Sequence, residues 1–342
     1  MNNRVFIQAA TQISMQQPLS EQWMTDPVLQ NELLVKAVNP VFRDFIPVNE
    51  ARRMGSFIKR AIVTSLKVLK DSGMEHPDAI VTGTSIGSLE YTERILDGMT
   101  ENGEESLSPT FFMQSTHNTV GSAIAIYTKT HGYNTTYSHG QLSFDLALRD
   151  AEMQLQMGTC STALVGGHDE MTEAYFTLLQ KTGYLGQEGM VACGEVAVSV
   201  LLTADNTTDR LCELAGIRIF REAGIKHCAT ILDTMLQEAG MTTSDISAIM
   251  TGINGNKPND RFYADITQAL FPDKPLLRYK HLFGENYTAS AFGVYTAAQC
   301  LKTETIPACL TVGAGPVPTS PTSILLINQM NGKDISFTLL KK

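Results

Sequence analysis

The residues most suggestive of chemistry lie around one predicted turn. The segment Ser138-His139-Gly140-Gln141 follows a predicted strand at 134–137 and leads into the long apolar segment 142–157. Apolar residues wrap most of that segment, so we expect a buried central helix. The N-terminus of such a helix favours a thiolate nucleophile, because the helix dipole is positive there. In this sequence the position holds Gln141, whose carboxamide cannot form a thioester.

Two similar helix–turn–strand units indicate an α/β fold that could position this turn. The first unit ends its helix at Gly73 and enters a strand at 79–83, and the second ends at Gly240 and enters a strand at 248–252. Gly at a helix end, before a short polar link, is typical of a C-cap. The long separation of the units predicts a duplicated α/β half rather than a solenoid of short repeats. Further strands are expected at 5–10, 162–166, 196–203, 214–219, 310–313, 323–328 and 335–340.

The composition excludes several classes of protein. The chain has 342 residues, of which 43% are apolar and 18% charged, so disorder and coiled coil are both disfavoured. Asp and Glu (35) outnumber Lys and Arg (26), and the net charge of −9 argues against general binding to nucleic acid or anionic membranes. The six cysteines include no CxxC pair and no zinc-like grouping with histidine, so no metal site is expected.

The uncharged stretch 305–332 is the longest in the chain, and its prolines predict strands and turns rather than a membrane span. The apolar run at the start is too short for a signal peptide. We therefore expect a reduced, cytoplasmic protein.

Six short motifs occur in order along nearly the whole chain. They are Arg52-Arg53-Met54 before a long helix, Gly83-Thr-Ser-Ile-Gly87, the segment 108–118, Leu164-Val-Gly-Gly-His-Asp-Glu170, Gly194-Glu195-Val-Ala, and Lys280-His-Leu-Phe-Gly284. In this order they resemble the motifs of the β-ketoacyl synthases of the thiolase superfamily. The resemblance implies a thiolase-like α/β fold, with two duplicated βαβ halves, 1–205 and 206–342, forming a layered α-β-α-β-α core.

A working synthase of this family carries the acyl chain on a Cys at the N-terminus of the buried helix, and two His residues assist decarboxylation of malonyl units. The resemblance implies that these three positions are Gln141, Asn254 and Glu285 here, so no catalytic side chain is intact, whereas Lys280 is retained. It also implies an acyl pocket or partner interface that contains His139 and the residues Phe111, Phe112, Met113, Gln114, Thr116, His117 and Asn118.

The resemblance is strongest to chain-length factors, which also carry Gln at the Cys position. It implies a non-catalytic subunit of a β-ketoacyl-ACP synthase heterodimer in fatty acid or polyketide biosynthesis, and the short form is similar to subunits of aryl polyene clusters. The active ketosynthase partner would perform the decarboxylative Claisen condensation, while this chain shapes the acyl tunnel. No cofactor is implied beyond the phosphopantetheine that an acyl carrier protein brings.

Two alternatives stay open. The chain could be a 3-oxoacyl-ACP synthase-like acyltransferase or malonyl decarboxylase with an altered site, in which Glu285 or a displaced nucleophile such as Cys193 would act. It could instead be a homodimeric, non-enzymatic scaffold that binds acyl carrier protein. Arg53, Arg60 and Lys67 recur every seven residues along the predicted helix 54–69. They predict either a solvated basic face or a docking face for an acidic carrier protein.

Overall fold

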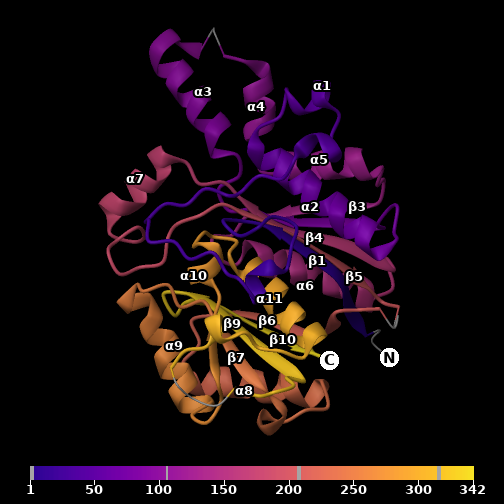
Figure 1. Cartoon of the computed structure of the whole chain (residues 1–342), viewed down its shortest axis with the longest axis vertical. Helices are drawn as coiled ribbons and strands as arrows, with labels where there is room; N and C mark the ends of the chain where they lie inside the picture. Colours follow the sequence, from indigo (N-terminus) through magenta and orange to yellow (C-terminus); the bar gives the residue numbers. More distant parts are fainter. Residues whose placement is uncertain (1–3, 105–106, 206–208, 314–316) are drawn as a thin grey trace.

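The ten strands of the described chain form one sheet in the order β3-β2-β4-β5-β1-β6-β10-β9-β7-β8 (Figure 1). This computed structural model describes residues 4–104, 107–205, 209–313 and 317–342. The strands are β1 (Val5–Ile13), β2 (Ala79–Gly83), β3 (Tyr133–Tyr137), β4 (Thr162–Asp169), β5 (Val196–Thr203), β6 (Cys212–Arg221), β7 (Ala248–Thr251), β8 (Leu276–Arg278), β9 (Ser323–Met330) and β10 (Asp334–Lys341).

The two halves of this sheet have the same topology. The first half has the order β3-β2-β4-β5-β1 and the second has β8-β7-β9-β10-β6, so each strand has a counterpart at the same place. In both halves the first three strands are parallel and the remaining pairings are antiparallel. The halves join through the short pairing of β1 with β6, from Val5↔Leu214 to Ile7↔Cys212. This correspondence confirms the predicted duplication of βαβ halves.

Helices cover both faces of each half and produce the predicted layers (Figure 1). Helices α2 and α5 pack on the outer face of the first half, α6 and α11 lie between the halves, and α8 contacts β6 and α9 on the far side. The helices are α1 (Val48–Ala51), α2 (Ser56–Ser72), α3 (Leu89–Asn102), α4 (Pro109–Ser115), α5 (Thr119–Thr128), α6 (Ser143–Gln156), α7 (Glu173–Thr182), α8 (Ile225–Glu238), α9 (Lys257–Leu270), α10 (Lys280–Phe283) and α11 (Ser290–Thr303).

Most residues of α6 and nearly all residues of α11 are buried in the central core. Buried side chains of both helices share one apolar cluster with strands of both halves, and separate clusters lie under α2 with α5 and under α8 with α9. In α11 every residue from Ser290 to Leu301 is buried. The expectation that the segment 142–157 forms a buried central helix is therefore confirmed by α6.

The two predicted C-caps have the required backbone. Gly73 ends α2 with φ +68°, and Gly240 follows α8 with φ +67°. Only Gly adopts this left-handed region at little cost.

One strand prediction was wrong, and one strand was missed. The segment 310–313 is not a strand, because residues Ala308–Leu310 form a 3-10 helix and Thr311 makes only an isolated bridge. The three-residue strand β8 was not predicted. The proposed boundary at 205/206 lies beside residues 206–208, outside the described part of the chain, and the two-domain division stays a prediction.

Candidate functional site

The turn between β3 and α6 places Gln141 at the entrance of the central helix, as predicted. Gly140 adopts φ +52°, which allows the chain to reverse sharply before the helix. The Ser143 hydroxyl fixes the turn by accepting from the His139 amide at 2.8 Å and donating to the Gly140 carbonyl at 2.8 Å. Gln141 is only 2% exposed. Its carboxamide therefore stands at the helix N-terminus but inside the protein.

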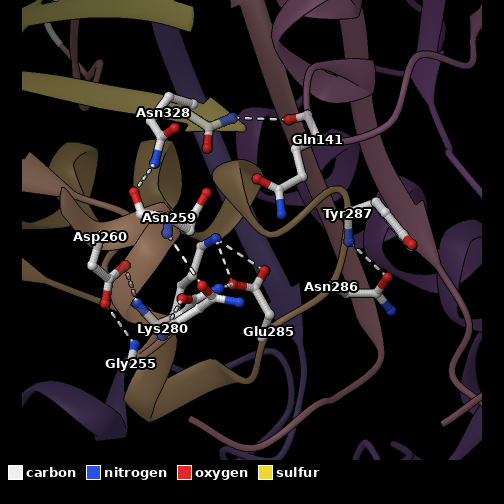
Figure 2. A network of polar contacts seen from close by, with 12 residues as sticks. Gln141, Gly255, Asn259, Asp260, Lys280, Glu285, Asn286, Tyr287 and Asn328 are labelled. Atoms are coloured by element: carbon white, nitrogen blue, oxygen red, sulfur yellow. Dashed lines mark hydrogen bonds and ion pairs between the residues drawn. The ribbon is translucent and has the colours of Figure 1, made fainter. Parts of the chain in front are cut away.

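The contacts of Gln141 leave one of its polar atoms without a partner. Its Nε2 donates to the Tyr184 hydroxyl at 2.9 Å. Its backbone carbonyl accepts from Asn328 Nδ2 at 2.8 Å, as Figure 2 shows. Its Oε1 has no hydrogen-bond partner in the described protein. These contacts hold a carboxamide, which is not a nucleophile, where the resemblance implied a thiol.

The loop after β7 positions Asn254, the first of the two predicted histidine equivalents. Asp260 accepts from the amides of Asn254 at 3.2 Å and Gly255 at 2.8 Å. Asn256 caps α9 by accepting from the Asn259 amide at 3.1 Å, and its own amide donates to Asn254 Oδ1 at 3.0 Å. Asn254 is 1% exposed. Its side chain is thus oriented from both sides.

Asn254, Lys280 and Glu285 form one buried network (Figure 2). Lys280 Nζ lies 2.9 and 2.7 Å from the two carboxylate oxygens of Glu285, and Asn254 Nδ2 donates to Glu285 Oε2 at 2.6 Å. Lys280 is 2% exposed and Glu285 is fully buried. Lys280 belongs to helix α10 and Glu285 to the segment just after it, so the two residues are five positions apart in the sequence. The two positions predicted to replace histidines, Asn254 and Glu285, thus meet at one site with the retained Lys280. Asn256 and Tyr184 link this site to Gln141.

This network leaves little for decarboxylative chemistry. An enolate oxygen needs N–H or O–H donors aimed at it. Here Asn254 Nδ2 and the Lys280 ammonium both donate to Glu285. Glu285 itself is a carboxylate, which would repel a developing negative charge rather than stabilise it.

Cys193, the displaced nucleophile considered above, lies beside the network but is not poised to react. It forms an isolated bridge with Glu285 and is completely buried. Burial, together with the nearby Glu285 carboxylate, raises the pKa of the Cys193 thiol to about 12. A thiol rather than a thiolate is therefore present at neutral pH.

The predicted pocket or interface residues lie on and after α4, apart from this network. Phe111 stacks on Tyr91 with ring centroids 5.2 Å apart, whereas Phe112 and Met113 are 62% and 69% exposed. Gln114 Nε2 donates to the Arg53 carbonyl at 2.8 Å, which ties α4 to the start of α2. Figure 1 shows α4 beside α3 at one extremity of the molecule. The remaining predicted members of this set, Thr116, His117, Asn118 and His139, are exposed.

The predicted basic docking face on α2 is wrong in part. Arg60 is 3% exposed, and its guanidinium makes a two-pronged ion pair with Glu195 at 2.9 and 2.6 Å. Lys67 pairs with Asp71 on the same helix at 2.5 Å, and only Arg53 is fully on the surface. Arg60 therefore serves to join α2 to the strand end at Glu195 and cannot meet a carrier protein.

Three residues of the site were not found from the sequence. Asp145 in α6 is buried and accepts from Ser290 Oγ at 2.7 Å and Asn328 Nδ2 at 3.0 Å, and burial raises the pKa of its carboxyl. A carboxylate inside the apolar run 142–157 was the available signal for it. Asn328 and Tyr184 carried no such signal, because their contacts with Gln141 join segments 187 and 43 residues apart.

Across the described ranges, no group of three or more His, Cys, Asp and Glu side chains could hold a metal ion. No helix in the same ranges has the length and apolarity needed to cross a bilayer.

Comparisons with known proteins agree with this fold. A family profile described as beta-ketoacyl synthase, N-terminal domain, matches residues 21–234, more than half of the chain. No curated protein matches the sequence.

Three solved structures are similar over essentially the whole chain. One is the ishigamide ketosynthase/chain length factor, with a TM-score of 0.83, 17% identity and 100% of both chains covered. Another is the complex of the ketosynthase ApeO with its chain length factor ApeC from Xenorhabdus doucetiae, with a TM-score of 0.79 and 15% identity over 99% of this chain and 98% of that chain. The third is AntDE:AntF, a type II PKS acyl-carrier protein in complex with its ketosynthase bound to the hexaketide, with a TM-score of 0.79 and 13% identity over 100% of this chain and 99% of that chain. These likenesses confirm the predicted thiolase-like fold.

Proposed function

The chain belongs to the β-ketoacyl synthase family, and we propose that it acts there as the non-catalytic, chain-length-factor-like subunit of a heterodimer with an active ketosynthase. One observation carries the proposal. The three positions expected to hold Cys and two His hold Gln141, Asn254 and Glu285, and the last two spend their polar groups on each other and on Lys280. A subunit without a nucleophile or free donors at this site depends on a partner for condensation.

Exposed apolar side chains give this subunit a surface for a partner. Phe112 and Met113 on α4 and Ile126 on α5 are 62%, 69% and 75% exposed. Strand β3 stands at the end of the sheet order, so its outer edge has no neighbour among the described strands. Large exposed apolar side chains and an open strand edge both favour association. We propose that the α4 segment and His139 lie at the heterodimer interface and help to bound the partner's acyl tunnel.

In this proposal the condensation is carried out by the heterodimer and not by this chain alone. The partner's Cys would hold the acyl chain while carrier-bound malonyl loses CO₂ and attacks the thioester, so that one C–C bond forms and the thiol is released. The solved complex AntDE:AntF holds an acyl-carrier protein with its ketosynthase, and ApeO is a ketosynthase in complex with its chain length factor. By analogy we propose an acyl carrier protein as a third partner, a polyketide or fatty-acid-like product and, more narrowly, an aryl polyene.

Co-expression with a candidate ketosynthase tests the proposal. We expect a one-to-one complex by size exclusion with light scattering, and condensation of malonyl units only when both chains are present. Phe112→Asp with Met113→Asp should abolish co-purification. The matched control is Leu178→Asp on α7, because Leu178 is 57% exposed but lies away from α4 (Figure 1).

Two results would contradict the proposal. The first is condensation or malonyl decarboxylation by this chain alone that disappears in Gln141→Ala. The second is a stable homodimer that binds carrier protein and ignores every ketosynthase offered, which would favour the scaffold.

A further inference from the structure

The segment between α7 and β5 closes over Gln141. This 183–192 loop presents Tyr184, whose hydroxyl accepts from Gln141 Nε2 at 2.9 Å. Tyr184 is half-buried, whereas Gln141 beneath it is 2% exposed. The partly exposed Tyr184 side chain thus directly contacts the buried side chain at position 141.

Tyr184 is held from its backbone as well as its hydroxyl. Its carbonyl accepts from Asn256 Nδ2 at 2.8 Å, and Asn256 is itself bonded to Asn254 Oδ1. The adjacent Leu185 is buried in a small apolar cluster with Met171, Leu179 and Cys193. The side chain is therefore anchored on both sides rather than lying loosely on the surface.

The far end of the 183–192 loop is fastened to the same site. The Val191 amide donates to the Asn254 carbonyl at 2.9 Å, and the Ala192 carbonyl accepts from the Glu285 amide at 2.7 Å. A Cβ added to Gly255 would lie 2.5 Å from the Gly189 carbonyl oxygen, so the two loops touch backbone to backbone. This contact needs the Gly at position 255, which also has φ +88°.

The Tyr184 hydroxyl is chemically suited to keep its hydrogen bond with Gln141. Burial and the nearby Glu285 carboxylate raise the pKa of its phenol well above the ordinary value. It remains a neutral hydroxyl that can accept from Gln141 at any physiological pH.

We propose that Tyr184 is a specificity-determining residue that plugs this subunit's own acyl site and excludes the acyl-pantetheine arm. Closure is a property of this chain alone. Its consequence, that the carrier's arm has one productive site in the pair, rests on the proposed function.

The alkylation rate of a cysteine placed at position 141 measures whether the Tyr184 ring blocks access to that position. In Gln141→Cys the thiol stands at the N-terminus of α6, where a helix dipole favours the reactive thiolate once solvent reaches it. Bromoacetyl-pantetheine mimics the arm, and its bromide leaves as the thiol sulfur attacks the methylene carbon. Mass spectrometry of the peptide that contains residue 141 separates this alkylation from that of the six native cysteines.

The expected order of labelling rates identifies the ring as the barrier. Gln141→Cys should label slowly, and the added Tyr184→Ala should raise the rate about tenfold or more. Tyr184→Phe should stay slow, because the ring remains. The matched control is Tyr175→Ala, since Tyr175 is a half-buried neighbour whose hydroxyl pairs with that of Tyr287, 3.0 Å away, rather than with Gln141.

Labelling in denaturant, equal for all variants, establishes that the thiol is free. Fast labelling of native Gln141→Cys, or an equal gain from Tyr175→Ala, would overturn the plug. Neither result would bear on heterodimer formation, so the proposal for Tyr184 and the proposed function can be refuted independently.

Discussion

Glu285→Gln should cost about 3–5 kcal/mol of unfolding free energy, because it leaves a buried ammonium without its anion. Lys280 Nζ and Glu285 Oε2 are 2.7 Å apart, and both side chains are almost fully buried. With an effective dielectric constant of about 20, their attraction is about 6 kcal/mol. That attraction roughly offsets the several kcal/mol that each ion loses on leaving water. Removal of one charge leaves the other's desolvation unmatched.

The reciprocal variant completes a double-mutant cycle. Lys280→Met leaves the Glu285 carboxylate with Asn254 Nδ2 as its remaining side-chain donor and should cost a similar amount. The double variant, which removes both charges, should be close to wild type, so the coupling energy is about 6 kcal/mol or more. A typical domain is stable by about 5–15 kcal/mol, so each single change is large.

Urea unfolding at pH 7 measures these differences. The one tryptophan of the chain, Trp23, packs edge-on against Phe283 of α10 with centroids 5.4 Å apart, so its fluorescence reports on the segment that carries the pair. Lys67→Met removes the exposed partner of Asp71 and should cost about 0.5 kcal/mol or less. Glu285→Gln within 1 kcal/mol of wild type, or a double variant whose loss equals the sum of both, would refute the coupling.

Three further substitutions, at Arg60, Gly255 and His168, have definite expected outcomes. Arg60→Lys keeps the charge but loses the two-pronged contact with Glu195, so it should lower the urea midpoint by the equivalent of about 1–3 kcal/mol without changing carrier-protein affinity in calorimetry. Gly255→Ala should cost about 1–3 kcal/mol in the same unfolding assay, since φ is +88° and the new methyl would meet the Gly189 carbonyl. His168→Leu should remove an acid-sensitive loss of stability, because burial lowers the pKa of His168 to about 3. The unfolded chain takes up a proton below about pH 6.5 and the folded chain does not, so from pH 6.5 to 5 the wild type loses about 2 kcal/mol that the variant keeps.

The pH prediction for His168 must be measured as a difference between variant and wild type. Burial raises the pKa of Asp169 and of Glu170 to about 6 each, which acts in the opposite direction. A carboxyl with a raised folded pKa adds stability as the pH falls through 6, since the folded chain then binds the proton first. Both carboxyls are present in both proteins, so they cancel. Parallel stability curves between pH 7 and 5 would contradict the role of His168.

Local patterns in the sequence predicted the parts of the fold that depend on local physics. Gly73 and Gly240 both mark helix ends, because the left-handed backbone there needs Gly wherever the rest of the chain lies. The apolar segment 142–157 predicted a central helix for the same reason, since most of its apolar side chains are buried, although Met153 and Met157 are exposed. Strand β8 was missed because three residues are too few to show a period.

Contacts between distant segments were beyond such patterns. The predicted helix 54–69 is confirmed by α2, although Arg53 lies before it, but periodicity cannot show that Glu195 lies opposite Arg60, 135 residues away. Tyr184 stands in a polar loop whose composition is that of any surface turn. Its meeting with Gln141 depends on how α7 and the 183–192 loop return to the site, which no local propensity specifies.

The retained Lys280 is explained by packing rather than by chemistry. A lysine at a family motif suggests residual activity, yet its ammonium donates to both oxygens of the Glu285 carboxylate. A buried carboxylate at position 285 requires a cation within reach, and a buried lysine requires an anion, so each side chain makes the other necessary. A buried glutamate at position 285 therefore requires Lys280 for charge balance, even where no substrate is bound. The pair stabilises the loop from Asn254 to Asn256, and that loop in turn holds Tyr184 over Gln141. In the proposed subunit, loss of catalysis and closure of the site would therefore be two effects of one network.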